Sequence, residues 1–279
     1  MYSMSHHIKL LRPLNVITSG MAVFVATAIL GELDNHHTLS LTIIIVMLFT
    51  AASNSLNDAL DYEIDLINRP DRPIPSNHVS IQGALFISLI LFLIGAALCL
   101  QLPGLAIVVG IFLAIPLIII YCTSLKSRYL IGNIAVSLVL GMTFFFVGAS
   151  HGNVSPMVVP MCLAFGLTLL RELVKDIADI EGDQFLGLRT FPILFGMNWA
   201  IRTIIVLCIL IGLGSLIPYF LGVYGPGYIV SLFIGVELPL MIIIFIFLKN
   251  PSISSAIYSA RILKFSTLMG LLSIYLGTI

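Results

Sequence analysis

The chain has 279 residues, of which 59% are hydrophobic and only 9% are charged, and its mean hydropathy is +1.12. A soluble domain of this length needs far more surface charge, so the composition excludes one. The 13 basic and 13 acidic residues give a net charge of zero, which argues against a nucleic-acid partner. The four cysteines lie in or at the ends of apolar runs without metal-type spacing, which indicates small buried side chains and no disulfide framework.

Apolar runs that match the thickness of a bilayer recur along the whole chain. We expect nine membrane-spanning helices, at about 14–31, 39–60, 82–101, 104–122, 132–150, 157–178, 199–221, 227–248 and 258–277. The first run has the full length of a span and no small-residue cleavage site, so we interpret it as a retained membrane helix. The sequence therefore predicts an all-α, multi-pass membrane protein built as one domain over residues 1–279.

The distribution of Lys and Arg is an independent check on these spans, because the apolar runs alone define them. With nine spans, all 13 Lys and Arg residues fall at or near one face, and the opposite segments 32–38, 102–103, 151–156 and 222–226 contain none. Basic residues mark cytoplasmic loops. We therefore expect the N-terminus to be cytoplasmic and the C-terminus to lie outside the cell membrane.

Six of the 13 acids fall in two distant clusters that share the spacing D-x-x-D-x-x-x-D. The members are Asp58, Asp61 and Asp65 in the first cluster, and Asp176, Asp179 and Asp183 in the second. Both clusters end even-numbered spans, and a basic, proline-containing loop follows each. The clusters therefore open on the cytoplasmic face in the same orientation, which predicts a parallel internal repeat, unlike the inverted repeats of many transporters.

The chemistry of the clusters indicates a hard cation. Positions i, i+3 and i+7 share one helical face, so each cluster predicts a stripe of carboxylates about two turns long. Oxygen ligands suit Mg²⁺, which keeps several waters and is often shared with substrate phosphates. No His or Cys lies within either cluster, which disfavours zinc and copper. The predicted metal ligands are Asn57 and the six aspartates, and Asn54 adds a neutral oxygen donor for substrate.

Basic residues beside the clusters complete a candidate diphosphate site. Carboxylate-bound Mg²⁺ and basic side chains would hold a diphosphate and would stabilise pyrophosphate as it departs. An apolar tunnel between the helices would hold a lipid tail and keep water away from an allylic cation. The basic residues predicted for this role are Arg69, Arg72, Lys126, Lys175 and Arg189.

These motifs resemble those of the UbiA superfamily of intramembrane prenyltransferases. Segment 68–76, NRPDRPIPS, looks like one loop of that family, and the resemblance covers nearly the whole chain. The other matching residues are Asn57, Asp58, Asp61 and Asp65 in its first motif, Asp179, Asp183, Gly187 and Thr190 in its second, and Tyr121 and Lys126 in a third segment.

The resemblance implies nine helices around a central cavity and Mg²⁺-dependent transfer of a prenyl group from its diphosphate. It implies catalytic roles for four aspartates, which would bind the diphosphate through the metal: Asp61, Asp65, Asp179 and Asp183. Tyr121 would stabilise the cationic prenyl group through its ring. The alternative for Tyr121 is an interfacial tyrosine without a catalytic role.

Three segments, DYEIDLINRPDRPIPS, LIGNIAVS and RELVKDIADIEGD, look most like the branch of the family that builds archaeal-type ether lipids. That branch transfers a geranylgeranyl group from geranylgeranyl diphosphate to the sn-2 hydroxyl of geranylgeranylglyceryl phosphate. The acceptor carries a phosphate, for which Arg12, Arg171 and Lys175 are available. The alternatives are an aromatic quinone precursor or a chlorophyll-type acceptor and, from another class, a cation-coupled transporter, whose site would usually lie near the membrane midplane.

Glu237 stands apart from these motifs. It lies near the middle of the eighth predicted span, where an ionisable group is costly and is a functional candidate by default. It matches no motif of the family, so we expect it to be paired within the helices.

Overall fold

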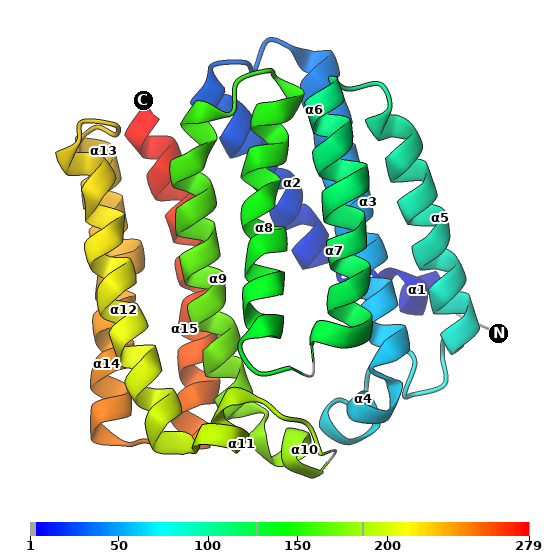
Figure 1. Ribbon diagram of the computed structural model, residues 1–279, viewed down its shortest axis with the longest axis vertical. Coiled ribbons are helices and arrows are strands. Elements are labelled where there is room, and N and C mark those ends of the chain that lie inside the picture. Colours follow the sequence, from blue (N-terminus) through cyan, green and yellow to red (C-terminus); the bar gives the residue numbers. More distant parts are fainter. Residues whose placement is uncertain (1–3, 127, 186, 279) are drawn as a thin grey trace. The chain divides into compact units, whose positions relative to one another are not determined.

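The structure is a computed structural model that describes residues 4–126, 128–185 and 187–278. Within these residues, nine helical segments are long and apolar enough to cross a membrane, and the only β-type pairing is one isolated bridge. The described chain is drawn as helices joined by loops (Figure 1). The predicted all-α class and its nine spans are confirmed, with boundaries that shift by a few residues. The protein is therefore a multi-pass membrane protein.

The chain forms two compact units. Unit 1 comprises Met1–Lys126 and Thr143–Ser155, and unit 2 comprises Ser127–Met142 and Pro156–Ile279. Helix α8 (Ile131–Ser150) contributes its first part to unit 2 and its second part to unit 1. The predicted single domain, internal repeat and central cavity all remain predictions.

Unit 1 contains the first four spans. Its elements are α1 (Met4–Leu10), α2 (Pro13–Leu30), α3 (His36–Leu60), α4 (Tyr62–Asn68), α5 (Ile81–Cys99), α6 (Gly104–Ile107), η1 (Val108–Ala114), α7 (Ile115–Ile120) and η2 (Tyr121–Leu125). Local signals set the ends of these helices. Gly31 ends α2 with φ 71°, and the side chains of Asn35 and Ser80 cap α3 and α5 by accepting from backbone N–H groups.

Helix α3 packs against both α2 and α5. Gly95 lets α5 come close, because a Cβ atom there would lie 2.6 Å from the ring of Phe49. Two hydroxyls join the helices: Ser55 donates to the carbonyl of Ala84 at 2.8 Å, and Ser88 donates to the carbonyl of Ala52 at 2.9 Å. Small residues and short interhelical hydrogen bonds are typical of packing inside membranes. These contacts fix α3, which carries Asp58 and leads directly into the rest of the first acid cluster.

Unit 2 contains the remaining spans. Its elements are the first part of α8, α9 (Val158–Ala178), α10 (Ile180–Phe185), α11 (Phe191–Phe195), α12 (Met197–Phe220), α13 (Pro226–Leu232), η4 (Phe233–Glu237), α14 (Leu238–Lys249) and α15 (Ile253–Thr278). Helix α15 contacts α9, α13 and α14, and α12 lies beside α9 and α14 (Figure 1). Gly277 of α15 permits close contact, since a Cβ atom there would lie 2.8 Å from Cβ of Tyr228.

Two spans contain wider, π-helical turns that the sequence analysis did not predict. The fourth span includes η1 just before Pro116, and the eighth includes η4 just before Pro239. Proline has no N–H to donate into the preceding turn and its ring crowds that turn, so the backbone hydrogen bonds shift to a wider register. A further π-helical turn, η2, holds Tyr121 at the end of the fourth span.

Candidate active site

Each acid cluster lies where one helix ends and a shorter one begins. Asp61 separates α3 from α4 with φ −88° and ψ 11°, and Asp179 separates α9 from α10 with φ −99° and ψ 6°. These angles fall in the bridge region of the backbone map. The i to i−4 hydrogen bonds continue across both junctions, from Asp65 to Asp61 at 2.8 Å and from Asp183 to Asp179 at 3.0 Å. The predicted stripe on one regular helix is thus bent, at the middle aspartate of each cluster.

The first cluster is buried and paired with cations. Asp58 and Asp65 are each 2% exposed, and Asp61 is 5% exposed. The Arg72 guanidinium donates to both of the outer carboxylates, at 3.0 Å to Asp58 and 2.5 Å to Asp65. The hydroxyl of Ser76 donates to the carbonyl of Arg72 at 2.6 Å, which holds the basic loop in place. Arg72 therefore links the two ends of the bent helix.

Arg12 reaches the same cluster from the start of the first span. Its guanidinium pairs with Asp58, and its backbone has φ 52°, an uncommon value for a residue other than glycine. The amide of Asn54 donates to the carbonyl of Leu11 at 2.9 Å, so it fixes the residue that precedes Arg12. Asn54, predicted to bind substrate, thus contacts the backbone that positions a basic side chain.

Lys126 is the third cation that contacts the first cluster, and it follows the π-helical turn η2. Its ammonium group contacts Asp61 and donates to Asn57 at 3.2 Å, and the amide of Asn57 donates to Asp61 at 2.7 Å. Tyr121 is half-buried at the start of η2, and Arg69 is exposed in the loop after α4. The cations of Arg12, Arg72 and Lys126 thus balance the three carboxylates.

Burial and charge act in opposite directions on Asp65, which lies outside the spans. Burial raises the pKa of its carboxyl above the ordinary value, and the neighbouring Arg72 guanidinium lowers that pKa. Arg72 is therefore the group that favours the charged form of Asp65.

The second cluster lies within unit 2. Asp183 is 9% exposed, and Asp176 accepts a hydrogen bond of 2.9 Å from the amide of Asn133 on α8. Asn133 is itself 8% exposed. Its contact with Asp176 was not predicted, although a polar residue at the start of an apolar span is a signal for such a contact.

Glu172 is a second residue that the sequence analysis missed. On α9 it accepts from Arg171 at 2.9 Å through Oε1 and from Lys175 at 2.7 Å through Oε2. Two of the three basic residues predicted for the acceptor phosphate, Arg171 and Lys175, are thus brought together on one carboxylate, whereas Arg12 pairs with Asp58. Arg189, predicted for the diphosphate, is exposed and pairs through its backbone with Arg128.

The donor atoms of both clusters fit Mg²⁺ in their chemistry. Among residues 4–126, 128–185 and 187–278, no three His, Cys, Asp or Glu side chains are grouped to hold a metal ion by themselves. Protein-bound Mg²⁺ usually takes one or two carboxylates and completes its shell with waters and substrate phosphates. The buried carboxylates of Asp58, Asp61 and Asp65 match that mode of binding, since they supply oxygen alone.

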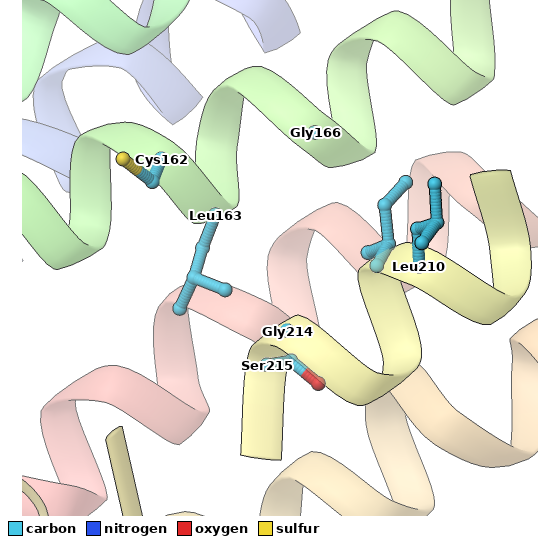
Figure 2. Close-up of a pocket in the computed structure, with 7 residues that line it drawn as sticks. Cys162, Leu163, Gly166, Leu210, Gly214 and Ser215 are labelled. Carbon is cyan, nitrogen blue, oxygen red and sulfur yellow. The ribbon is translucent and has the colours of Figure 1, made fainter. Parts of the chain in front are cut away.

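A pocket of about 220 Å³ lies between α9 and α12, apart from these acids in unit 2 (Figure 2). Its lining is mostly apolar, and Leu163 of α9 and Leu210 of α12 extend toward it. At its edge the Ser215 hydroxyl donates to Glu237 at 2.5 Å. Glu237 is therefore paired within the helices, as predicted.

Fold and site together define a helical membrane protein with two bent aspartate clusters, each close to basic residues. Residues 15–268 match the UbiA prenyltransferase family. Because this match spans most of its length, the chain belongs to the UbiA prenyltransferase family.

Relatives within the family narrow the comparison. The chain is 37% identical over 226 residues to digeranylgeranylglyceryl phosphate synthase of Natronomonas pharaonis, with 81% of each chain covered. It is 33% identical over 276 residues to the synthase of the same name from Methanosphaera stadtmanae, with 99% of this chain and 100% of the relative covered.

Solved structures agree on the fold. One concerning digeranylgeranylglyceryl phosphate synthase superposes with a TM-score of 0.80 at 28% identity and covers 100% of this chain and 99% of that one. A UbiA homolog from Archaeoglobus fulgidus, solved with GPP and Mg²⁺ bound, superposes with a TM-score of 0.69 at 16% identity, covering 96% of this chain and 99% of that one.

Proposed function

We propose that the protein transfers a geranylgeranyl group from geranylgeranyl diphosphate to the sn-2 hydroxyl of geranylgeranylglyceryl phosphate. The observation that carries this proposal is the identity of 33% over 276 residues to a digeranylgeranylglyceryl phosphate synthase, since it extends over both acid clusters and their basic partners. Such a reaction builds the second ether bond of an archaeal-type lipid.

In this proposal the aspartates bind the donor diphosphate through Mg²⁺. Mg²⁺, when bound, neutralises the diphosphate and stabilises pyrophosphate as a leaving group. The proposed ligands are Asn57, Asp58, Asp61 and Asp65 in unit 1, and Asp176, Asp179 and Asp183 in unit 2. Arg72 and Lys126 already contact carboxylates, so each can exchange a carboxylate oxygen for a phosphate oxygen when the donor binds.

The transfer itself needs little from the protein beyond positioning and charge. The bond between C1 of the prenyl chain and the diphosphate oxygen breaks, and its electron pair leaves with pyrophosphate. C1 then bonds to the sn-2 oxygen, whose proton passes to pyrophosphate or to water. Tyr121 is the proposed stabiliser of the cationic chain, through the face of its ring.

In this proposal Arg171 and Lys175 bind the phosphate of the acceptor. Both are basic residues of α9, partly exposed at 31% and 32%, and their charged ends meet at Glu172. Arg12, which was also predicted to bind the acceptor phosphate, contacts Asp58 in unit 1. Arg69 and Arg189, which were predicted to bind the donor diphosphate, are exposed. We therefore assign the acceptor phosphate to the two α9 side chains first.

We also propose an orientation in the cell membrane. Of the 13 Lys and Arg residues, 12 lie at or near the span ends that share one face, and Lys264 lies near the middle of the last span. Basic residues mark the cytoplasmic side. The N-terminus and both acid clusters would then be cytoplasmic, and the C-terminus would lie outside.

The test is transfer by the purified protein. Labelled geranylgeranyl diphosphate and geranylgeranylglyceryl phosphate are incubated with Mg²⁺ or with a chelator, and the lipid product is identified by mass. Doubly geranylgeranylated glycerophosphate that forms only with Mg²⁺ is the expected result. Absence of transfer, together with ion flux when the protein is placed in liposomes, would instead favour a cation-coupled transporter.

A further inference from the structure

Helix α9 holds three charged side chains in one ionic group. Glu172 is only 13% exposed, and each of its two carboxylate oxygens accepts from a different cation. Oε1 accepts from Arg171 at 2.9 Å, and Oε2 accepts from Lys175 at 2.7 Å. The use of both oxygens distinguishes Glu172 from a carboxylate that merely lies near positive charge.

The arrangement solves a physical problem. Arg171 and Lys175 lie four residues apart on one helix, where like charges repel. Both side chains are long and lose much rotamer freedom when a ligand fixes them. A carboxylate between them cancels the repulsion and orients both cations before any ligand arrives. The group keeps one net positive charge, which suits an anionic ligand.

We infer that Glu172 is a positioning residue that holds Arg171 and Lys175 as a two-pronged clamp for the phosphate of the acceptor lipid. This inference rests on the proposed function, because it needs an acceptor that carries a phosphate. Glu172 itself does not touch the phosphate. It acts through the two cations, which turn their remaining N–H groups to the ligand.

A positioning role for Glu172 and a purely electrostatic role predict opposite effects of its removal on phosphate binding. If Glu172 were only a nearby negative charge, its removal would strengthen phosphate binding, because one repulsive charge would be lost. If Glu172 positions the clamp, its removal weakens phosphate binding, because the cations repel each other and lose their orientation. The sign of the change therefore separates the two roles.

The experiment compares Glu172→Gln and Glu172→Asp with the wild-type protein. We expect Glu172→Gln to raise the acceptor KM about tenfold, as loss of one charge-assisted hydrogen bond would. The donor KM should stay within about twofold, because the donor diphosphate is assigned to other residues. Glu172→Asp keeps the charge and should recover part of the loss. Glu32→Gln, which changes an exposed acid in the loop after α2, is the matched control.

Binding without turnover supplies an independent readout. Geranylgeranylglyceryl phosphate, added without donor or Mg²⁺, should stabilise the wild-type protein against heat and should stabilise Glu172→Gln much less. An acceptor KM that is unchanged or lowered in Glu172→Gln would overturn the positioning role. If Glu172→Gln does not fold, Glu172→Asp decides, because its acceptor KM must still rise above the wild-type value.

Two further variants separate this inference from the proposed function. Arg171→Ala and Lys175→Ala should each raise the acceptor KM. If neither does, the phosphate assignment fails, and the role of Glu172 fails with it. If both do and the Glu172 variants behave as wild type, the assignment stands and only the positioning role is overturned.

Discussion

In unit 1, the three aspartates at the junction of α3 and α4 contact cations that come from three other segments of the chain. These are Arg12 before α2, Arg72 in the loop after α4, and Lys126 after η2. In unit 2, the neutral amide of Asn133 bonds Asp176, and the nearby cations of α9 contact Glu172.

The backbone of the two clusters is nevertheless the same. The middle aspartate of each lies between two helices with nearly equal angles, and the hydrogen bonds continue through the bend. The first cluster and Asp176 of the second therefore have different partners. If Mg²⁺ binds, the carboxylates of the first cluster exchange cations for it, whereas Asp176 has a neutral amide beside it. We therefore expect the first cluster to depend strongly on its basic partners.

The largest effect should come from the aspartates themselves. Asp61→Ala, Asp65→Ala, Asp179→Ala and Asp183→Ala should each lower kcat by about 10³-fold or more, since each removes charge that holds the metal at the departing pyrophosphate. Transfer of labelled prenyl group measures this, and thermal unfolding confirms that each variant folds. If any two of the four kept normal activity, the assignment of both clusters to the donor would be wrong.

The next effect tests the dependence of the first cluster on cations. Arg72→Ala leaves Asp58 and Asp65 buried without their shared partner, so it should destabilise the protein by about 2–4 kcal/mol in the absence of Mg²⁺. Added Mg²⁺ should restore part of the loss. Thermal unfolding in detergent with and without Mg²⁺ gives both numbers.

Arg261→Ala is the matched control, because Arg261 is an exposed arginine of α15 in unit 2. It should change the unfolding temperature little. Equal destabilisation by both arginine variants would mean that the pairing of Arg72 with the carboxylates contributes nothing specific.

A smaller effect is expected from Asn133→Ala. The change removes the donor to Asp176 and should cost about 1–2 kcal/mol, because it leaves one hydrogen bond to a charged group unmade. Unlike Arg72→Ala, it should not depend on the cations of unit 1. The measurement compares the free energy of unfolding of Asn133→Ala with that of Asn153→Ala, a control in the exposed loop after α8. A loss as large as that of Arg72→Ala would erase the distinction between the clusters.

Much of the fold was predictable because a bilayer constrains it strongly. The length of each apolar run and the turn residues between runs were sufficient for the spans. The π-helical turns were missed, although Pro116 and Pro239 in the sequence mark where helical hydrogen bonds must rearrange. The bends at Asp61 and Asp179 have no such signal, because a polar helix end carries no apolar periodicity.

The candidate site was predictable in its residue types and less so in its pairings. The spacing of the aspartates selected the clusters, and the structure brings Arg12, Arg72 and Lys126 to the first of them. Partners such as Asn133 and Glu172 were not predicted, because neither belongs to the repeated aspartate spacing and the sequence does not show which side chains lie next to each other. The predicted roles of the site residues themselves remain predictions.

The measurement that tests the account most directly is a competition between acceptors. Purified protein receives Mg²⁺, labelled geranylgeranyl diphosphate and equal amounts of geranylgeranylglyceryl phosphate, its dephosphorylated analogue and an aromatic quinone precursor. The account predicts that the label enters doubly geranylgeranylated glycerophosphate almost alone, because Arg171 and Lys175 bind the phosphate. Label in the aromatic compound, or equal label in the dephosphorylated analogue, would contradict it.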